Sequence, residues 1–169
     1  MASLDSIGLA RGTDKSSRCH DYLNQIYEPL TFESPVKVVV EFGVYLGASL
    51  QTFRDFFSEA VVYGVDIRPC PFRGIHPRIR FIRGDYRHVS TPIPDVCDLI
   101  IDDASHVAHD ILAGFAAHGW RVRAGGYYVM EDLHVVPQIH QWISLGAPAG
   151  WDIHAHTPKI LVLRRSSNV

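Results

Sequence analysis

The amino-acid sequence predicts an α/β fold, a doubly wound sheet of about seven strands that is mostly parallel and ends in an antiparallel hairpin. Two observations predict it. Short β-branched runs alternate along the chain with segments whose apolar residues have helical spacing. The runs are continuously apolar, as in parallel strands whose two faces are both covered by helices. In such Rossmann-like sheets, ligands bind outside the carboxyl ends of the strands.

Residues 1–35 are expected to form a helical arm or lid. Residues 12–17, GTDKSS, predict a turn followed by the start of a helix. We expect this helix to continue through Tyr27, and Pro29 and Pro35 then close the arm. The buried stripe of the helix is expected to contain Cys19, Tyr22, Leu23 and Ile26.

The next segments predict a β-turn-α-β unit and a further strand. Residues 36–42 and 61–66 are β-branched runs, and residues 79–82 form a third run. Between the first two, residues 48–57 predict a helix, because their large apolar side chains recur at helical spacing. Those side chains are Leu50, Phe53, Phe56 and Phe57.

The second half of the chain repeats this alternation. Residues 98–102 predict a fourth strand, and a glycine pair at 125–126 is expected to break the chain before a fifth strand at 126–130. A helix between them is expected to present one apolar face, formed by His109, Leu112, Phe115, Ala116 and Trp120. A short helix after Pro137 and a hairpin of residues 151–156 and 160–164 complete the expected sheet.

Length and composition are those of one globular domain. The 169 residues, 47% hydrophobic and 20% charged, predict a single domain over 1–169. The net charge of −2, with basic residues spread along the chain, argues against nucleic acid as a partner. No apolar run approaches the ~20 residues of a membrane span, and no secretory signal is visible, so we expect a cytoplasmic protein. Cys19, Cys70 and Cys97 are expected to be reduced thiols.

The fourth predicted strand ends in a group of residues that carry chemistry. Its apolar run stops at two adjacent carboxylates, Asp102 and Asp103, and an imidazole, His106, stands three residues beyond the second. An acid and a base at this spacing indicate an ion site beside a general base. His106 has a simpler alternative, because it could merely cap the helix that follows.

The fifth predicted strand ends in the same way, at Glu131 and Asp132, with His134 nearby. If the two strands are parallel neighbours, their ends lie about 5 Å apart and four carboxylates crowd one crevice. Such a concentration of negative charge favours a hard cation, and carboxylate oxygens suit Mg²⁺, Mn²⁺ or Ca²⁺.

The turn after the first strand indicates the class of ligand. It has the pattern Glu41-x-Gly43-x-x-x-Gly47 in place of the three glycines that close around a pyrophosphate. An acid just inside the strand suits a ligand with a cationic amino group, such as S-adenosylmethionine. Asp66 and Asp85 end the next two strands, where they could accept ribose hydroxyls and lie near an adenine amino group. The alternative is that Asp and Gly stand there only because they favour turns.

Four segments carry a resemblance to the class I S-adenosylmethionine-dependent methyltransferases. They are 12–15 (GTDK), 41–49 (EFGVYLGAS), 101–106 (IDDASH) and 131–134 (EDLH). Within that group the chain is most similar to the metal-dependent O-methyltransferases of the mycinamicin and macrocin type, which act on sugar hydroxyls of macrolides and related glycosylated natural products. The resemblance covers nearly the whole chain, but the chain lacks the long insertion that would cover a substrate.

The resemblance implies roles for particular residues. Mg²⁺, with Mn²⁺ as a substitute, would be held by Asp103, Glu131 and Asp132, and His106 would be the general base. His134 would be a second base, a substrate contact or a loop residue. Roles in binding S-adenosylmethionine are implied for Thr13, Glu41, Gly43, Tyr45, Ser49, Asp66, Asp85 and Asp102. Asp102 could instead support the metal.

The expected activity is methyl transfer to a hydroxyl of a small-molecule acceptor. The N-terminal arm, residues 133–150 or a neighbouring subunit could close the pocket, and the resemblance implies a homo-oligomer. Catechol methyltransferases are similar, but the histidine base and the wholly acidic pair at 131–132 favour the sugar-hydroxyl group. Two other hypotheses are a phenol or catechol methyltransferase and a non-catalytic subunit that binds S-adenosylmethionine. An NAD-dependent oxidoreductase is disfavoured by the missing three-glycine turn.

Overall fold

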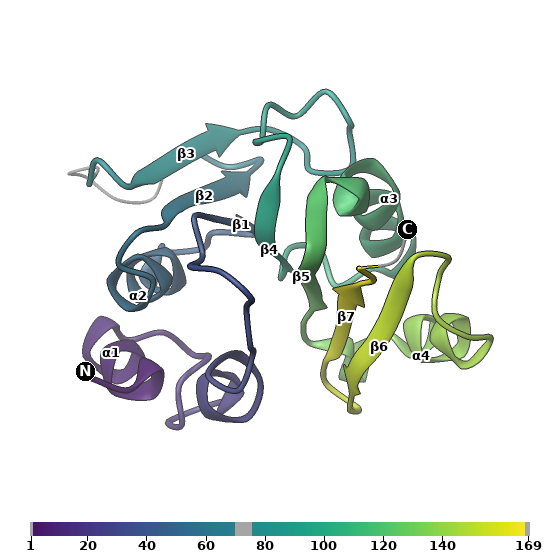
Figure 1. The fold of residues 1–169 in the computed structure, drawn as a ribbon, viewed down its shortest axis with the longest axis horizontal. Helices are drawn as coiled ribbons and strands as arrows, with labels where there is room; N and C mark the ends of the chain where they lie inside the picture. The colour runs from purple at the N-terminus through teal and green to yellow at the C-terminus, as the bar shows by residue number, and fades with distance from the viewer. Residues whose placement is uncertain (1, 70–75, 168–169) are drawn as a thin grey trace.

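A computed structural model describes residues 2–69 and 76–167 of the chain (Figure 1). Within these residues seven strands form one sheet in the order β3-β2-β1-β4-β5-β7-β6. β7 is antiparallel to both of its neighbours, and all other pairs are parallel. The predicted fold class is therefore confirmed. Cys70 lies outside the described residues.

The elements alternate as the sequence predicts. The strands are β1 (Val38–Phe42), β2 (Val61–Asp66), β3 (Ile79–Arg83), β4 (Cys97–Asp102), β5 (Val122–Met130), β6 (Trp151–His156) and β7 (Leu161–Arg165). The helices are α1 (Leu4–Arg11), α2 (Ala48–Phe56), α3 (Ala108–His118) and α4 (Pro137–Ser144). Three short helical turns are η1 (Leu23–Tyr27), η2 (Gly119–Arg121) and η3 (Leu133–Val135).

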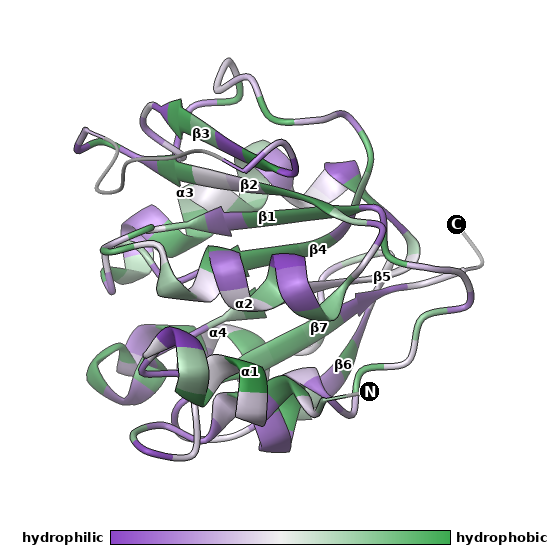
Figure 2. Ribbon diagram, turned by 90° about the vertical axis from the view of Figure 1, so that its left-hand side faces the viewer, coloured by the Kyte–Doolittle hydropathy of each residue, from purple (hydrophilic) through white to green (hydrophobic). Residues whose placement is uncertain are grey.

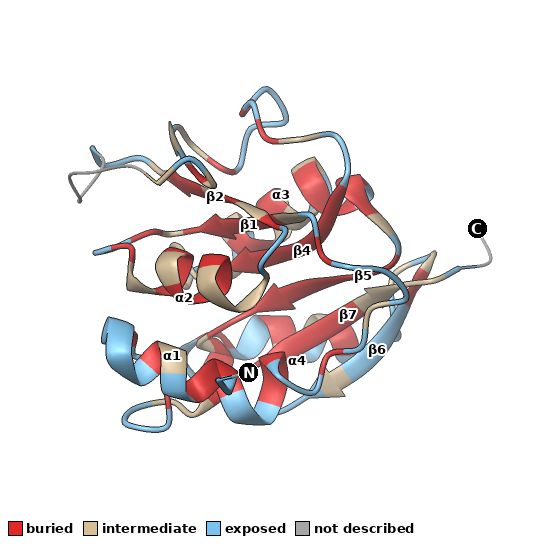
Figure 3. Cartoon of the chain, turned by 60° about the vertical axis from the view of Figure 1, so that its left-hand side comes forward, coloured by how far each residue is buried: buried red, intermediate tan, exposed pale blue. Residues whose placement is uncertain are grey.

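Helices cover both faces of the sheet, which explains the continuously apolar strands. Alternate residues of each strand point to opposite faces, so Val39 and Ile101 join one core while Val40 and Ile100 join the other. α1, η1 and α2 pack on the first face, and α3 and α4 on the second (Figure 1). Hydrophobic residues dominate the central strands (Figure 2), whereas the edge strand β6 is largely exposed (Figure 3).

The N-terminal arm differs from the prediction. The helix expected through Tyr27 is reduced to the π-helical turn η1, because Asp21 has a left-handed backbone with φ 59° that interrupts it. A separate helix, α1, precedes it and was not predicted. Ser3 caps the N-terminus of α1, and Gly12 ends it at φ 74°. Of the expected stripe, Tyr22, Leu23 and Ile26 are buried but Cys19 is exposed.

The glycine pair does not break the chain before β5. β5 starts at Val122 and runs through both glycines, and its pairing with β4 shifts register between Cys97 and Leu99. A Cβ at Gly126 would lie 2.7 Å from the carbonyl oxygen of Asp98. The glycines therefore permit a close approach of two strands and an irregular pairing.

The buried face of α3 also differs from the prediction. Ile111, Gly114 and His118 face the core. His109, Ala116 and Trp120 from the predicted face are exposed, whereas Leu112 and Phe115 pack at its margin. The helix is apolar on more than one side, so the spacing of apolar residues could not select the face. None of the described helices is long and apolar enough to cross a membrane.

Candidate active site

A cavity of about 520 Å³ lies at the carboxyl ends of the parallel strands. The segments after β1, β2, β3 and β4 line it, together with residues 13–15 of the arm and Asp132. β1 pairs with β2 on one side and β4 on the other, so the chain reverses its direction across the sheet at this point. Doubly wound sheets bind ligands at this place.

Three residues around the cavity have a strained backbone. Tyr45, His106 and Asp132 have φ values of 46°, 52° and 55°, in the left-handed region that disfavours side chains. Within the described part of the chain, only Asp21 is a further non-glycine residue of this kind. Backbone strain of this kind gathers at functional sites.

Gly43 allows two of the loops to meet. Its φ is +85°, and a Cβ there would lie 2.2 Å from the carbonyl oxygen of Asp103. Real side chains do not tolerate such a distance, so only glycine fits. The turn after β1 can therefore lie directly against the turn after β4, and both line the cavity.

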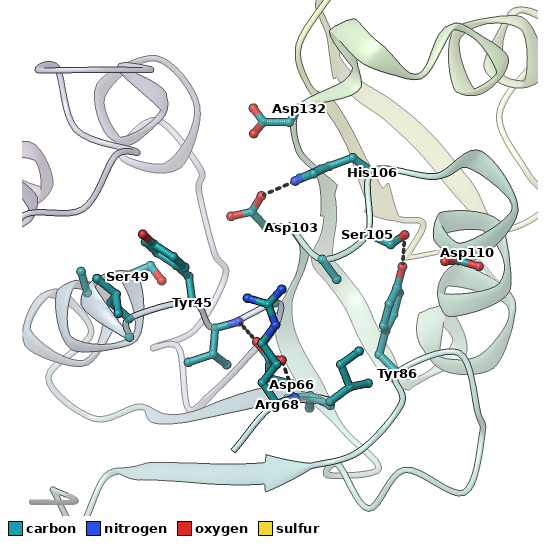
Figure 4. A pocket seen from close by; sticks show the side chains of 18 of the residues that line it. Tyr45, Ser49, Asp66, Arg68, Tyr86, Asp103, Ser105, His106, Asp110 and Asp132 are labelled. Carbon is teal, nitrogen blue, oxygen red and sulfur yellow. Dashed lines mark hydrogen bonds and ion pairs between the residues drawn. The ribbon is translucent and has the colours of Figure 1, made fainter. Parts of the chain in front are cut away.

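Asp66 stands at the end of β2 with both carboxylate oxygens held. Oδ2 accepts a hydrogen bond from the backbone N–H of Val44 at 3.0 Å, and Oδ1 accepts one from the N–H of Arg68 at 2.8 Å (Figure 4). Each oxygen of a carboxylate can accept more than one hydrogen bond. The two N–H groups therefore orient Asp66 at the cavity wall and leave it able to bind hydroxyl groups.

Asp85 follows β3 and is engaged by an arginine. Arg87 donates from Nη2 to Oδ2 of Asp85 at 2.6 Å and from Nε to Oδ1 of Asp85 at 2.9 Å. Its Nη1 also donates to Asp110 at 3.0 Å. The hydrogen bonds from Arg87 lower the pKa of Asp85 to about 2. Asp85 is thus ionised at neutral pH, and Arg87 shares the part of the cavity where an adenine contact was expected.

Asp103, His106 and Asp132 point toward one another at the other end of the cavity (Figure 4). One ligand atom of each lies within 4.8 Å of the other two. Nε2 of His106 is 3.9 Å from Oδ1 of Asp103. The hydroxyl of Tyr22 donates to Oδ1 of Asp132 at 2.6 Å. Two carboxylates and an imidazole at these distances could hold a divalent cation or move a proton.

Glu131 lies beneath this group and is fully occupied by the N-terminal arm. Its Oε2 is 2.6 Å from Nζ of Lys15, and its Oε1 accepts a hydrogen bond from the hydroxyl of Tyr27. Burial raises the pKa of Glu131, whereas Lys15 acts in the opposite sense. In this arrangement Glu131 anchors the arm to the end of β5.

Lys15 is a residue of this site that the sequence analysis did not single out. Its ammonium contacts Asp103 and Glu131 at 2.6 Å each and lies 3.5 Å from Glu41, and the side chain is 2% exposed. In the sequence it stands in a polar turn, where a lysine is usually on the surface. The only sequence feature that pointed to a functional role for Lys15 was its place in the GTDK segment, residues 12–15.

Two of the expected cofactor residues lie below the cavity wall. Glu41 is fully buried, accepts a hydrogen bond from Ser49 at 2.6 Å and has its pKa raised to about 7 by burial. Its cationic neighbour is Lys15. Asp102 is 1% exposed, and its Oδ1 has no hydrogen-bond partner among the described residues. Burial raises the pKa of Asp102 well above its usual range.

The sequence-predicted residues therefore fall into three groups. Those that line the cavity are Thr13, Gly43, Tyr45, Ser49, Asp66, Asp85, Asp103, His106 and Asp132. Those that lie beneath it are Glu41, Asp102 and Glu131. His134 is exposed on η3 and does not line the cavity.

The chain is similar in sequence to several known O-methyltransferases. No protein-family model matches it. It is 32% identical over 149 residues to 8-demethyl-8-alpha-L-rhamnosyl tetracenomycin-C 2'-O-methyltransferase of Streptomyces olivaceus, covering 79% of this chain and 38% of the relative. The chain is therefore similar in sequence to part of a sugar O-methyltransferase. Mycinamicin VI 2''-O-methyltransferase of Micromonospora griseorubida is 34% identical over 93 residues, covering 52% of this chain and 23% of that enzyme.

The resemblance seen in the sequence is thus confirmed, although the chain spans less than two fifths of the length of these sugar O-methyltransferases. Among solved structures, the mycinamycin methyltransferase MycE in complex with Mg, SAH and mycinamycin VI superimposes with a TM-score of 0.74. The match has 21% sequence identity and covers 98% of this chain and 54% of MycE. At this identity the match supports the fold.

Proposed function

We propose that the chain carries an S-adenosylmethionine-dependent, Mg²⁺-dependent O-methyltransferase site that acts on a sugar hydroxyl of a glycosylated natural product. One observation carries the proposal most strongly. A single cavity holds an oriented carboxylate, Asp66, in one wall and the group of Asp103, His106 and Asp132 in another. The first suits a nucleoside, and the second suits activation of a hydroxyl.

The cavity fits a nucleoside-sized cofactor. Its volume of about 520 Å³ lies in the range of small-molecule sites, roughly 300–1,000 Å³. Asp66 can accept both hydroxyls of a ribose, because two backbone N–H groups fix its orientation. When bound, S-adenosylmethionine supplies a methyl group on a sulfonium. Thr13 and Tyr45 line the cavity and would enclose it.

The donor set at the other end fits a hard divalent cation. Asp103 and Asp132 offer carboxylate oxygens from the ends of neighbouring strands, the ligands that Mg²⁺ and Mn²⁺ prefer. We propose that they hold Mg²⁺ together with Glu131, as expected from the sequence. When bound, Mg²⁺ supplies stabilisation of the negative charge that develops on the acceptor oxygen.

His106 is the proposed general base. Its Nε2 lies beside the carboxylates of Asp103 and Asp132 in the same wall of the cavity, and this atom would accept the proton of the acceptor hydroxyl (Figure 4). Transfer of a proton to a positioned side chain contributes typically about 10²–10⁴-fold to the rate. His134, which is exposed away from the cavity, would contact only a large acceptor.

Transfer of a labelled methyl group tests the proposal. The protein is incubated with S-adenosylmethionine and acceptors in two sets, rhamnosides and other glycosides in one and catechols in the other. We expect methylation of a glycoside, its loss with EDTA and its return with Mg²⁺. Turnover that persists in EDTA would contradict the role of Asp103, Glu131 and Asp132. Methylation of catechols alone would support the phenolic alternative instead.

Calorimetric titration separates binding from catalysis. Tight binding of S-adenosylmethionine without transfer to any acceptor would support a non-catalytic subunit, and binding of NAD in its place would contradict the methyltransferase proposal. Asp66→Ala is expected to weaken cofactor binding. The expected homo-oligomer stays a prediction, which sedimentation analysis of the protein tests, and cytoplasmic location stays a prediction as well.

A further inference from the structure

The ammonium of Lys15 lies between the two acidic strand ends. It is 2.6 Å from Oδ2 of Asp103, which follows β4, and 2.6 Å from Oε2 of Glu131, which follows β5. Glu41, the last residue but one of β1, is 3.5 Å away. One positive charge thus faces three carboxylates at the point where the sequence predicts a metal ion.

This lysine is enclosed rather than placed at the surface. Its side chain is 2% exposed, and Glu41 and Glu131 are 0% and 1% exposed. Lysine is almost never buried to this degree unless it is paired. Without a cation the carboxylates would repel one another, so Lys15 balances part of their charge.

The same arm contacts the acids with two further side chains. Tyr27 donates to Glu131, and Tyr22 donates to Asp132 at 2.6 Å. Thr13 and Asp14, the neighbours of Lys15 in the chain, line the cavity. A movement of Lys15 would therefore change both the acidic group and the lining of the cavity.

We propose that Lys15 is a tethered counter-ion that a divalent cation displaces. The inference rests on the metal site of the proposed function. Lys15 engages Oε2 of Glu131, and the hydroxyl of Tyr27 engages Oε1. A cation held jointly by Asp103 and Glu131 therefore needs a carboxylate oxygen that Lys15 now occupies. An ammonium and a divalent cation on the same oxygens repel each other strongly. Binding of the metal therefore releases Lys15, and with it the segment that borders the cofactor cavity.

Chemical labelling of lysines tests the displacement directly in the wild-type protein. The chain has only three lysines, Lys15, Lys37 and Lys159, so acetylation at each can be followed by mass spectrometry. Lys37, with a 58% exposed side chain, is the internal control. Without divalent cation we expect Lys15 to be protected relative to Lys37. With saturating Mn²⁺, whose binding is followed by electron paramagnetic resonance, we expect Lys15 to become reactive while Lys37 is unchanged.

Two results would contradict the displacement of Lys15 by a divalent cation. Continued protection of Lys15 while Mn²⁺ is bound would overturn it and leave the proposed function intact. Absence of Mn²⁺ binding would overturn it together with the metal part of that function, whereas cofactor binding is measured separately by calorimetry.

A variant provides a second measurement. If Lys15 occupies the site about 90% of the time, Lys15→Met should bind Mn²⁺ about tenfold more tightly. Lys37→Met should bind it with wild-type affinity. Equal or weaker Mn²⁺ binding by a folded Lys15→Met protein, checked by circular dichroism, would overturn the displacement. Should this variant fail to fold, the labelling of the wild-type protein decides.

Discussion

Gly43 and Asp103 meet backbone to backbone, and a Cβ at Gly43 would lie 2.2 Å from the carbonyl oxygen of Asp103. The contact joins the turn after β1 to the turn after β4, and these two turns carry residues from both ends of the candidate site. The position of the acidic group relative to the cofactor cavity therefore depends on the absence of a side chain at Gly43.

Replacing Gly43 with alanine should damage both stability and cofactor binding. The new Cβ meets backbone that cannot move away easily, and the φ of +85° adds strain of about 1–2 kcal/mol. Gly12→Ala is the matched control, since Gly12 has a φ of +74° and nothing within 4 Å of its Cβ position. In urea denaturation, the free energy of unfolding should fall further in Gly43→Ala than in Gly12→Ala, by about 1–3 kcal/mol. Equal losses would mean that the two turns separate freely.

Removal of the Lys15 charge should destabilise the fold. Lys15→Met leaves buried carboxylates without their partner, and breaking a buried pair from one side costs about 3–5 kcal/mol. Lys37→Met is the control, because it removes a lysine that pairs with Glu59 at the surface. The side chains of Lys37 and Glu59 are 58% and 54% exposed. Such a pair contributes less than about 1 kcal/mol. Chemical denaturation of both variants in metal-free buffer measures the difference, and a small effect at Lys15 would contradict its burial.

Loss of the His106 imidazole should slow methyl transfer without affecting cofactor binding. His106→Ala removes the proposed base, so the rate should fall by about 10²–10⁴-fold. His109→Ala is the control, because His109 lies on the same loop-to-helix segment with an 86% exposed side chain. Single-turnover rates and calorimetry separate the two effects. A normal rate in His106→Ala would assign the proton transfer to another group.

His118 should make the fold less stable in mild acid. It is fully buried and packs on Phe42, and burial, together with the charge of Arg121, lowers its pKa. The unfolded chain therefore binds a proton near pH 6.5 while the folded chain does not. The stability that neutral His118 contributes is therefore complete above about pH 6.5 and is lost as the pH falls toward the lowered pKa of His118 in the folded chain.

His118→Phe removes this titration. Between pH 7.5 and pH 5.5 the variant should lose less free energy of unfolding than the wild type, as measured by urea denaturation at each pH. An equal loss in the two proteins would show that other groups control the acid sensitivity.

The sheet could be predicted from the sequence because its strands have a strong local pattern. The apolar runs that became β1, β2 and β4 are continuous, and residues that end them, such as Asp66 and Asp102, are polar. Parallel pairing of β4 with β5 sets Asp102 opposite Met130, so the acids that follow both strands become neighbours, as expected. The gathering of Asp103 and Asp132 followed from this register.

The N-terminal arm could not be predicted in the same way. Its helix is interrupted at Asp21, and its side chains find partners far along the chain, with Lys15 contacting residues 88 and 116 positions away. Polar turns look alike in a sequence whether they lie on the surface or over a charged site. The face of α3 was ambiguous for a related reason, because Ile111 and Leu112 are both apolar and only packing selected Ile111.

By itself the sequence determined the order of the strands, where they end and which acids stand at those ends. These features depend on neighbours in the chain and on the alternation of helices and strands. Only the tertiary structure decided how the acids are paired. Charge pairing depends on separations of a few ångströms and on exclusion of water. Both exist only after the arm has folded against the sheet and placed the ammonium of Lys15 between Asp103 and Glu131.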